Sequence, residues 1–173
     1  MKKYIRTILE WGSLIVIAWM LSFGIRTFFL DTRIVPTGSM LPTIQLQDRL
    51  IFDKFFYRNQ PLQRGDIVML TAPEGSGETD DLVKRIIGLP GETIEIRDGQ
   101  VFIDEIPIEE PYLKEPPDYE YGPVKIPEGM YVVLGDNRNN SKDSHVWGFV
   151  PEKNIQGKVL IRYWPLENWG KLK

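Results

Sequence analysis

The sequence lacks cysteine altogether and contains a single histidine, His145. Without thiols the chain forms no disulfide, has no thiolate nucleophile and cannot build a cysteine-based zinc site. One imidazole is too few for most histidine-based metal sites. We therefore expect no metal centre and no thiol chemistry. The lack of cysteine does not fix the compartment, since exported proteins can lack it too.

Clustered positive charge is missing from most of the chain. Residues 1–30 hold four basic residues and one acidic residue, a charge of +3, whereas the whole chain has −3, which leaves −6 on residues 31–173. Binding to phosphate backbones depends on clustered lysine and arginine side chains. The charge pattern therefore predicts no nucleic acid as a partner.

The chain has one long hydrophobic run, WGSLIVIAWMLSFGIRTFFL at residues 11–30. As a helix it would extend ~30 Å, the thickness of the hydrocarbon core of a bilayer. No small-x-small cleavage pattern follows it, so a retained transmembrane signal anchor is favoured over a removed signal peptide or a buried or interfacial helix. The basic residues Lys2, Lys3 and Arg6 would then be cytoplasmic, with residues 31–173 forming an extracytoplasmic domain.

Helical patterns of convincing length are absent after residue 31, where short apolar or alternating runs take over. The clearest run, TIEIRDGQVFI at 93–103, alternates on both sides of Asp98-Gly99, a pair typical of a tight hairpin turn. Other runs of strand length lie at 48–56, 65–71, 81–88, 130–136 and 157–164. The pattern predicts a mainly β domain built on an antiparallel sheet.

Two stretches lack a regular pattern. APEGSGETDD at 72–81 is typical of a polar loop between strands. Residues 104–129 contain six prolines and eight acidic residues against two lysines, a composition that disfavours core structure. We therefore predict an irregular surface excursion at about 104–129.

IVPTGSMLPTI at residues 34–44 places Ser39 between Pro36 and Pro42. Neither a helix nor a central strand accepts prolines at this spacing, so the segment predicts a stiff, non-helical path. A serine hydroxyl is a weak nucleophile until a neighbouring group accepts its proton. Two residues are candidates for that base, His145 and Lys84.

His145 lies in SKDSHVWG, two residues after Asp143, and serine, histidine and aspartate form a familiar hydrolase triad. Nothing in the local sequence indicates that the imidazole and the carboxylate meet. A lone histidine of this kind is usually a surface or structural residue, so this assignment stays an alternative.

Lys84 interrupts the apolar strand LVKRIIG. Desolvation by apolar neighbours would lower its pKa and make it a base, whereas Arg85 keeps its proton in any protein. The alternative is an edge-strand charge that discourages aggregation. LGDNRNNSKDS at 134–144 is either a structural turn or the source of a hydroxyl, such as Ser141, that orients a neutral lysine.

Three ordered segments resemble those of the type I signal peptidases, membrane-anchored serine-lysine endopeptidases that remove signal peptides from exported proteins. PTGSMLPT at 36–43 is similar to the nucleophile box of the family. RGDIVML and VKRIIGLPGE are similar to its strand and lysine boxes, and GDNRNNSKDSHVWGFVP to its final box. The resemblance covers nearly the whole chain, and DSHVWGF is similar to cyanobacterial and plant thylakoid members.

By position, the resemblance implies that Ser39 is the nucleophile and Lys84 the general base. The Thr37 hydroxyl, where many bacterial members have serine, and the Ser39 backbone N–H would form the oxyanion hole. Ser141 would orient the lysine, and Asp143 would support the final turn. Six residues align near the shallow apolar substrate pockets: Val35, Pro36, Met40, Ile44, Leu82 and Val83.

The family cleaves after small side chains in an Ala-x-Ala-like pattern, without a metal or an organic cofactor. The resemblance therefore implies signal peptides of secretory preproteins as substrates and the lipid bilayer as a partner. It also implies the plasma membrane, or in a photosynthetic cell the thylakoid membrane, as the location.

Three other assignments remain. A self-cleaving repressor would share the β core and the Ser-Lys pair, but it would carry a DNA-binding domain instead of the hydrophobic run. A membrane-tethered β binding module would need no dyad, although Ser39, Lys84 and Ser141 are all present. A Ser-His hydrolase would use His145, at a position where many bacterial signal peptidases have arginine.

Overall fold

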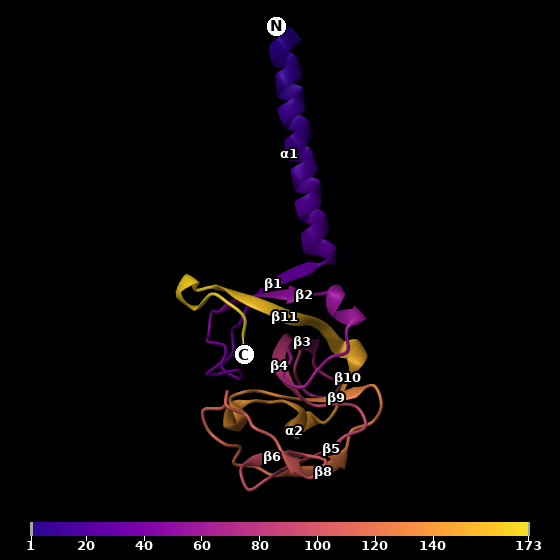
Figure 1. The fold of residues 1–173 in the computed structure, drawn as a ribbon, viewed down its shortest axis with the longest axis vertical. Helices are drawn as coiled ribbons and strands as arrows, with labels where there is room; N and C mark the ends of the chain where they lie inside the picture. Colours follow the sequence, from indigo (N-terminus) through magenta and orange to yellow (C-terminus); the bar gives the residue numbers. More distant parts are fainter. Residues whose placement is uncertain (1, 173) are drawn as a thin grey trace.

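The fold is that of a computed structural model, which describes residues 2–172 without the side chains at positions 2, 3, 5, 6, 8, 9 and 25–28. A long helix, α1 (Lys2–Phe28), projects away from a β-rich body (Figure 1). The predicted cytoplasmic residues Lys2, Lys3 and Arg6 have side chains outside the described set.

Large apolar side chains are exposed along α1. Trp11, Ile15, Trp19 and Leu21 are each more than 60% exposed in the isolated chain. Among the helical residues that the structure describes, no stretch is both long and apolar enough to cross a membrane. The predicted transmembrane anchor is therefore not confirmed by these residues.

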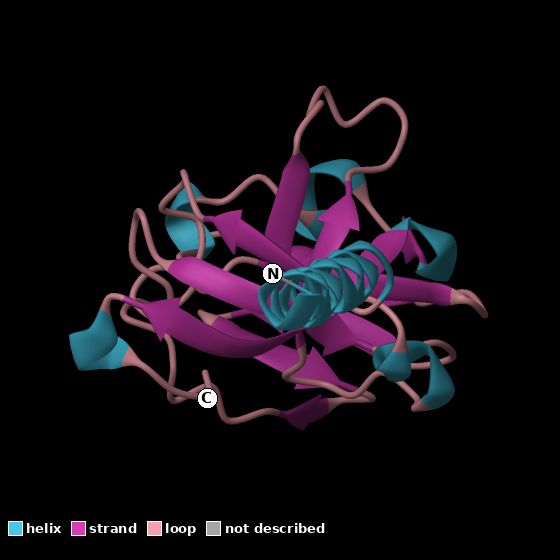
Figure 2. Cartoon of the chain, turned by 90° about the horizontal axis from the view of Figure 1, so that it is seen from above, coloured by secondary structure: helices cyan, strands magenta, loops and turns pink. Residues whose placement is uncertain are grey.

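Two antiparallel sheets form the body, in agreement with the predicted mainly β domain (Figure 2). The larger sheet has the order β1-β2-β11-β3-β4-β9-β10, and the smaller one the order β7-β6-β5-β8. The strands of the larger sheet are β1 (Leu30–Ile34), β2 (Arg49–Asp53), β3 (Ile67–Thr71), β4 (Asp81–Gly88), β9 (Met130–Leu134), β10 (Val150–Pro151) and β11 (Ile155–Trp164). Those of the smaller sheet are β5 (Thr93–Arg97), β6 (Gln100–Ile103), β7 (Ile106–Pro107) and β8 (Tyr121–Lys125).

The helices that follow the first strand are short. The longest described are the single turns α2 (Ser144–Trp147) and η1 (Phe56–Asn59), and three further 3₁₀ turns complete the set. These turns are η2 (Arg138–Asn140), η3 (Glu152–Asn154) and η4 (Leu166–Asn168). Strand-like patterning after residue 31 is thus confirmed.

The hairpin predicted at 93–103 is present as β5 and β6. Ile94 faces Ile103 across the pair, and the turn residues Asp98 and Gly99 have φ of 50° and 74°. Positive φ at both central positions is what a tight primed turn needs, and Asp-Gly tolerates it.

The prediction of an irregular excursion at 104–129 is partly wrong, because this stretch contains the strands β7 and β8. β8 pairs with β5 at the edge of the smaller sheet, where Pro123 needs no outer hydrogen-bond partner. Gly122 has a φ of 82°, and a Cβ there would overlap the Ile94 carbonyl oxygen. The stretch between these two strands is irregular, and short turns lie before β7 and after β8.

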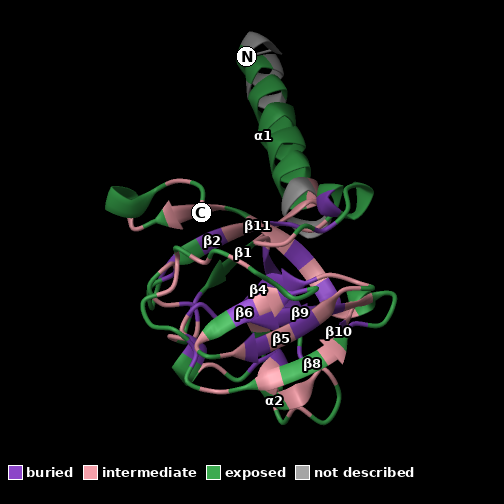
Figure 3. Ribbon diagram, turned by 60° about the horizontal axis from the view of Figure 1, so that its bottom comes forward, coloured by how far each residue is buried: buried purple, intermediate pink, exposed green. Residues whose placement is uncertain are grey.

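Among the described residues, the buried apolar side chains form three clusters. Figure 3 colours buried residues purple, and many of them lie on strands. One packs the smaller sheet against β4 and β9, through residues such as Ile94, Ile87 and Val132. Another packs the turn between β1 and β2 against β2 and β3, through Met40 and Met69. This second cluster fixes the segment that carries Ser39.

Candidate active site

The turn between β1 and β2, residues 35–48, presents Ser39. Backbone hydrogen bonds close its base, from Val35 N to the Asp48 oxygen (2.9 Å) and from Gln47 N to the Val35 oxygen (2.8 Å). Met40, the neighbour of Ser39, is buried in the core, while Ser39 itself keeps partial exposure. The apolar side of the turn thus holds the hydroxyl at the surface of the core.

Lys84 lies on β4, opposite Val68 of β3, and is only 3% exposed. Its Nζ is 2.7 Å from Ser39 Oγ and donates a hydrogen bond to it, across 45 residues of sequence. The structure therefore brings together the two side chains that the sequence singles out as nucleophile and base.

Burial lowers the pKa of Lys84 from its ordinary value. Three nearby carboxylates, those of Asp143, Glu78 and Asp136, act in the opposite direction, with Asp143 the strongest. Desolvation disfavours the charged ammonium, and a neutral amine can accept the Ser39 proton. The pair is thus electrostatically suited to activate a hydroxyl nucleophile.

The loop after β9, residues 135–145, contacts the Ser39 turn through hydrogen bonds. Asn137 donates from its backbone N to the Ser39 oxygen and from its side-chain Nδ2 to the Gly38 oxygen, both at 3.0 Å. Gly135 packs so closely that a Cβ there would overlap the Ser39 oxygen. Sequence reasoning treated this stretch as a turn and missed the positioning part of Asn137.

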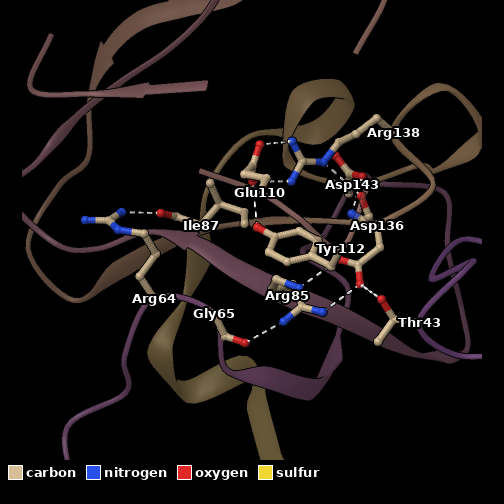
Figure 4. Close-up of polar contacts among 11 residues, drawn as sticks. Thr43, Arg64, Gly65, Arg85, Ile87, Glu110, Tyr112, Asp136, Arg138 and Asp143 are labelled. Carbon is tan, nitrogen blue, oxygen red and sulfur yellow. Dashed lines mark hydrogen bonds and ion pairs between the residues drawn. The ribbon is translucent and has the colours of Figure 1, made fainter. Parts of the chain in front are cut away.

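Arg85 and Asp136 form a buried ion pair behind the dyad (Figure 4). Arg85 Nε and Nη2 donate to the two Asp136 oxygens at 2.8 and 2.7 Å, and Thr43 Oγ1 donates to Oδ2 at 2.5 Å. Sequence reasoning excluded Arg85 as a base and did not predict this partner. The pair ties β4 and the 135–145 loop to the Ser39 turn.

Asp143 is fully buried and supports the same loop. Its Oδ2 accepts a hydrogen bond from Gly135 N (2.8 Å), and its Oδ1 lies 2.7 Å from His145 Nδ1. The His145 ring stacks on Tyr119, with centroids 4.0 Å apart. Imidazole and carboxylate therefore do meet, but within residues 2–172 no hydrogen bond joins His145 to Ser39.

Ser141 has a buried Oγ that finds no hydrogen-bond partner among the described residues. It lies beside Gly135, where an added Cβ would overlap it. The position is close to the Ser39 carbonyl, yet no hydrogen bond reaches Lys84. Its predicted orienting role therefore stays a prediction.

A cavity of about 430 Å³ opens at Ser39, with Thr37 also in its wall. Of the six predicted pocket residues, five line it: Val35, Pro36, Met40, Leu82 and Val83. Ile44 does not, because it is fully buried in the core behind the turn. Sequence reasoning missed Met69 and the polar rim at 78–81.

The acidic residues in the cavity wall all belong to the segment 78–81. Arg33, in the same wall, pairs with Asp81 at 3.3 Å. Among the described residues, no three histidine or acidic side chains converge in the manner of a metal site.

Comparison with known proteins identifies the family. Residues 8–164 match the model of the signal peptidase family, peptidase S26. The chain is 46% identical over 158 residues to "Signal peptidase I" of Leptolyngbya laminosa, covering 88% of this chain and 78% of that protein. It is 38% identical to "Thylakoidal processing peptidase 1, chloroplastic" of Arabidopsis thaliana, over 81% of this chain and 44% of that one.

A solved structure agrees with this relationship. The crystal structure of a signal peptidase I from Enterococcus faecalis superposes with a TM-score of 0.50 at 34% identity, covering 58% of this chain and 97% of that one. Sequence and fold point to the same group of enzymes. The chain therefore belongs to the signal peptidase family, peptidase S26, and is an enzyme of the signal peptidase I type.

Proposed function

We propose that this enzyme removes N-terminal signal peptides from exported preproteins with Ser39 as nucleophile and Lys84 as general base. The observation that carries the proposal is the buried Lys84 amine, 2.7 Å from Ser39 Oγ at the wall of a cavity. A Ser-His mechanism has less support, because His145 directs its Nδ1 to Asp143.

In the acylation step, neutral Lys84 takes the Ser39 proton while Ser39 Oγ attacks the peptide carbonyl carbon. The tetrahedral oxyanion accepts hydrogen bonds from the Ser39 N–H and the Thr37 hydroxyl. Within the described chain, no backbone acceptor engages that N–H, which leaves it free for this use. Lys84 then protonates the leaving amine, and the C–N bond breaks to give the acyl-enzyme.

Deacylation repeats the steps with water. Lys84, neutral again, takes a proton from water, and the hydroxide attacks the ester carbonyl. Collapse of the second tetrahedral intermediate returns the proton to Ser39 Oγ and releases the new carboxyl end. Asp143 would hold the loop in place during both steps, and Ser141 would orient the amine by a hydrogen bond.

The apolar lining of the cavity supports a preference for small side chains before the cut. Val35, Met40 and Val83 give it an apolar wall, to which Met69 of β3 also belongs. Such a wall excludes large residues by shape, as an Ala-x-Ala-like pattern requires. The substrate would lie extended next to a strand, a common mode of peptide recognition.

The bilayer is the proposed partner of α1. Apolar side chains are exposed on the described part of this helix, which only a lipid or another apolar partner would cover. At its base, Phe29 packs against Phe55 and Phe56, with ring centroids 5.2 and 5.6 Å away. Interfacial aromatic residues are typical of membrane proteins. We place the N-terminus in the cytoplasm and the β domain beyond the plasma membrane or, as for the plant relatives, the thylakoid membrane.

Preprotein cleavage by the full chain in detergent tests the proposal. Ser39→Ala and Lys84→Ala should abolish cleavage, because each removes half of the dyad. His145→Ala should reduce the rate without abolishing it. Full activity of Lys84→Ala, or total loss in a folded His145→Ala enzyme, would overturn the assignment.

A further inference from the structure

Part of the acidic, proline-rich excursion, residues 108–119, lies against the outside of the loop 135–145. Three of its side chains, those of Glu110, Tyr112 and Tyr119, each contact a charged or titratable residue. Each of these contacted residues is connected through hydrogen bonds to the loop next to Ser39 and Lys84. We propose that residues 108–119 form a brace that positions this active-site loop, with Glu110 and Tyr119 as positioning residues for Ser39 and Lys84. The inference rests on the proposed function.

The first contact of the brace is an ion pair (Figure 4). Glu110 accepts two hydrogen bonds from Arg138, at 2.8 and 2.6 Å. The Arg138 side chain is fully buried, and its Nε donates to the Gly135 oxygen at 3.0 Å. A buried guanidinium without its carboxylate is strongly unfavourable, so Glu110 is needed to keep Arg138 under the loop.

The second contact runs through Tyr112. Its hydroxyl donates to Glu110 at 2.6 Å, and the Arg85 guanidinium lies 3.9 Å from its ring centroid. Arg85 is the partner of Asp136, which accepts a hydrogen bond from Thr43 in the Ser39 turn. The brace thus covers the outer face of the ion pair behind the dyad.

The third contact is the stack of Tyr119 on His145, with ring planes 17° apart. The stack holds the imidazole against Asp143, which in turn accepts from Gly135 N. Asp143 is also the carboxylate with the strongest influence on the Lys84 pKa. Tyr119 therefore acts on Lys84 through two intermediate side chains.

All three contacts converge on residues 135–137, the piece of the loop that touches the Ser39 turn. Further hydrogen bonds fix the brace to the loop, from Asn139 Nδ2 to the Pro116 oxygen (3.0 Å) and from Asp118 N to Asn139 Oδ1 (2.9 Å). The loop lies between the brace and Ser39. A shift of the brace would therefore move the groups that hold Ser39 and surround Lys84.

The test compares Glu110→Gln with Glu109→Gln in the full chain in detergent. Both substitutions remove one carboxylate, but Glu109 is an exposed neighbour with no described ion pair. We expect kcat of Glu110→Gln to fall about tenfold to a hundredfold, since small misplacements of catalytic groups have effects of this size. Glu109→Gln should match wild type.

A loosened loop should also admit water to Lys84. Its pKa should then rise toward the ordinary value, which moves the rising limb of the kcat/KM profile to higher pH. The pH dependence of Lys84 acetylation by acetic anhydride, followed by mass spectrometry, reports the same change without any substrate. A purely structural role would lower Tm and leave both pH profiles in place.

A second pair of variants keeps the test decisive if Glu110→Gln unfolds. Tyr119→Leu removes the stack on His145, whereas Tyr119→Phe retains it and loses only a hydroxyl without a described partner. We expect the kcat of Tyr119→Leu to fall below that of wild type, and the kcat of Tyr119→Phe to stay close to the wild-type value. Equal kcat and equal pH profiles across folded Tyr119→Leu, Glu110→Gln and Glu109→Gln would overturn the brace.

Failure of the proposed function would look different. In that case Ser39→Ala would cleave preprotein as wild type does, or wild type would not cleave it at all. The acetylation profile of Lys84 would still respond to Glu110→Gln if the brace positions the loop. The two ideas therefore fail on separate measurements.

Discussion

Lys84 combines two requirements that oppose each other. An amine must be buried to be neutral near neutral pH, yet three carboxylates around it favour the charged form. Desolvation is the larger influence, and the pKa falls. The pKa of Lys84 can therefore be changed by substitution, because the removal of each carboxylate should lower it further.

Glu78→Gln should shift the pH profile of cleavage to lower pH. The neutral, active form of Lys84 increases as pH rises through its pKa, and Glu78 raises that pKa. Without this carboxylate the rising limb of kcat/KM should begin earlier. Glu74→Gln, an exposed change in the same loop, serves as the control. A limb that moves to higher pH would contradict the prediction.

Lys84→Met should inactivate the enzyme and change how its stability depends on pH. The folded-state pKa of Lys84 is lowered, so between that pKa and 10.5 the unfolded chain binds more protons than the folded one. Wild-type stability should therefore rise with pH in this window. The Tm of wild type minus that of Lys84→Met, measured from pH 7 to 10, should increase, and a flat difference would refute the burial argument.

At the scale of elements, the site depends on how β4 and the loop after β9 meet. Arg85 of β4 and Asp136 of the loop are 51 residues apart in the chain, and both side chains are buried. Removal of one partner from a buried ion pair leaves an uncompensated charge. A single neutral substitution at either residue should therefore strongly destabilise the contact between these two elements.

Asp136→Asn should destabilise the fold by about 3 to 5 kcal/mol. This corresponds to a fall in Tm of about 10 °C or more for a domain of this size. Thermal unfolding in detergent measures the change, and Asp98→Asn, at an exposed turn position, provides the matched control. A Tm equal to that of the control would show that the pair contributes little.

The elements differ in how far sequence predicts them. The hairpin at 93–103 follows local rules of alternation and turn chemistry, so its register is predictable. β8 is not, because its proline lies at a sheet edge that only the tertiary structure reveals. The chemistry of the segments predicts Ser39 as a nucleophile and leaves Lys84 and His145 as candidate bases, and only the resemblance to the signal peptidases favours Lys84. The contacts of Glu110 and Tyr119 have no local signature, since their partners lie more than twenty residues away.

At the scale of the whole molecule, α1 and the smaller sheet lie at opposite ends (Figure 1). The aromatic group of Phe29, Phe55 and Phe56 lies at the α1 end. If α1 is in the bilayer, this group should contact lipid headgroups. Ile106 of β7, also exposed, should remain in water.

The absence of native cysteine makes this arrangement directly measurable. A bimane fluorophore on Phe55→Cys should be quenched by nitroxide-headgroup lipids in vesicles that contain the full chain. The same fluorophore on Ile106→Cys should be quenched several-fold less. Equal quenching at the two positions would argue against the proposed orientation.

β11 comes late in the sequence but lies in the middle of the larger sheet. β11 lies between β2, which follows the Ser39 turn, and β3, the neighbour of the Lys84 strand. Its Arg162 also donates to the Thr43 oxygen (3.2 Å) and to Asp48 (2.9 Å) at the base of that turn. Thr37, Ser39 and Lys84 all precede β11 in the sequence, but only β11 joins β2 to β3 in the sheet that holds them. We therefore expect the enzyme to gain activity only once β11 has joined β2 to β3.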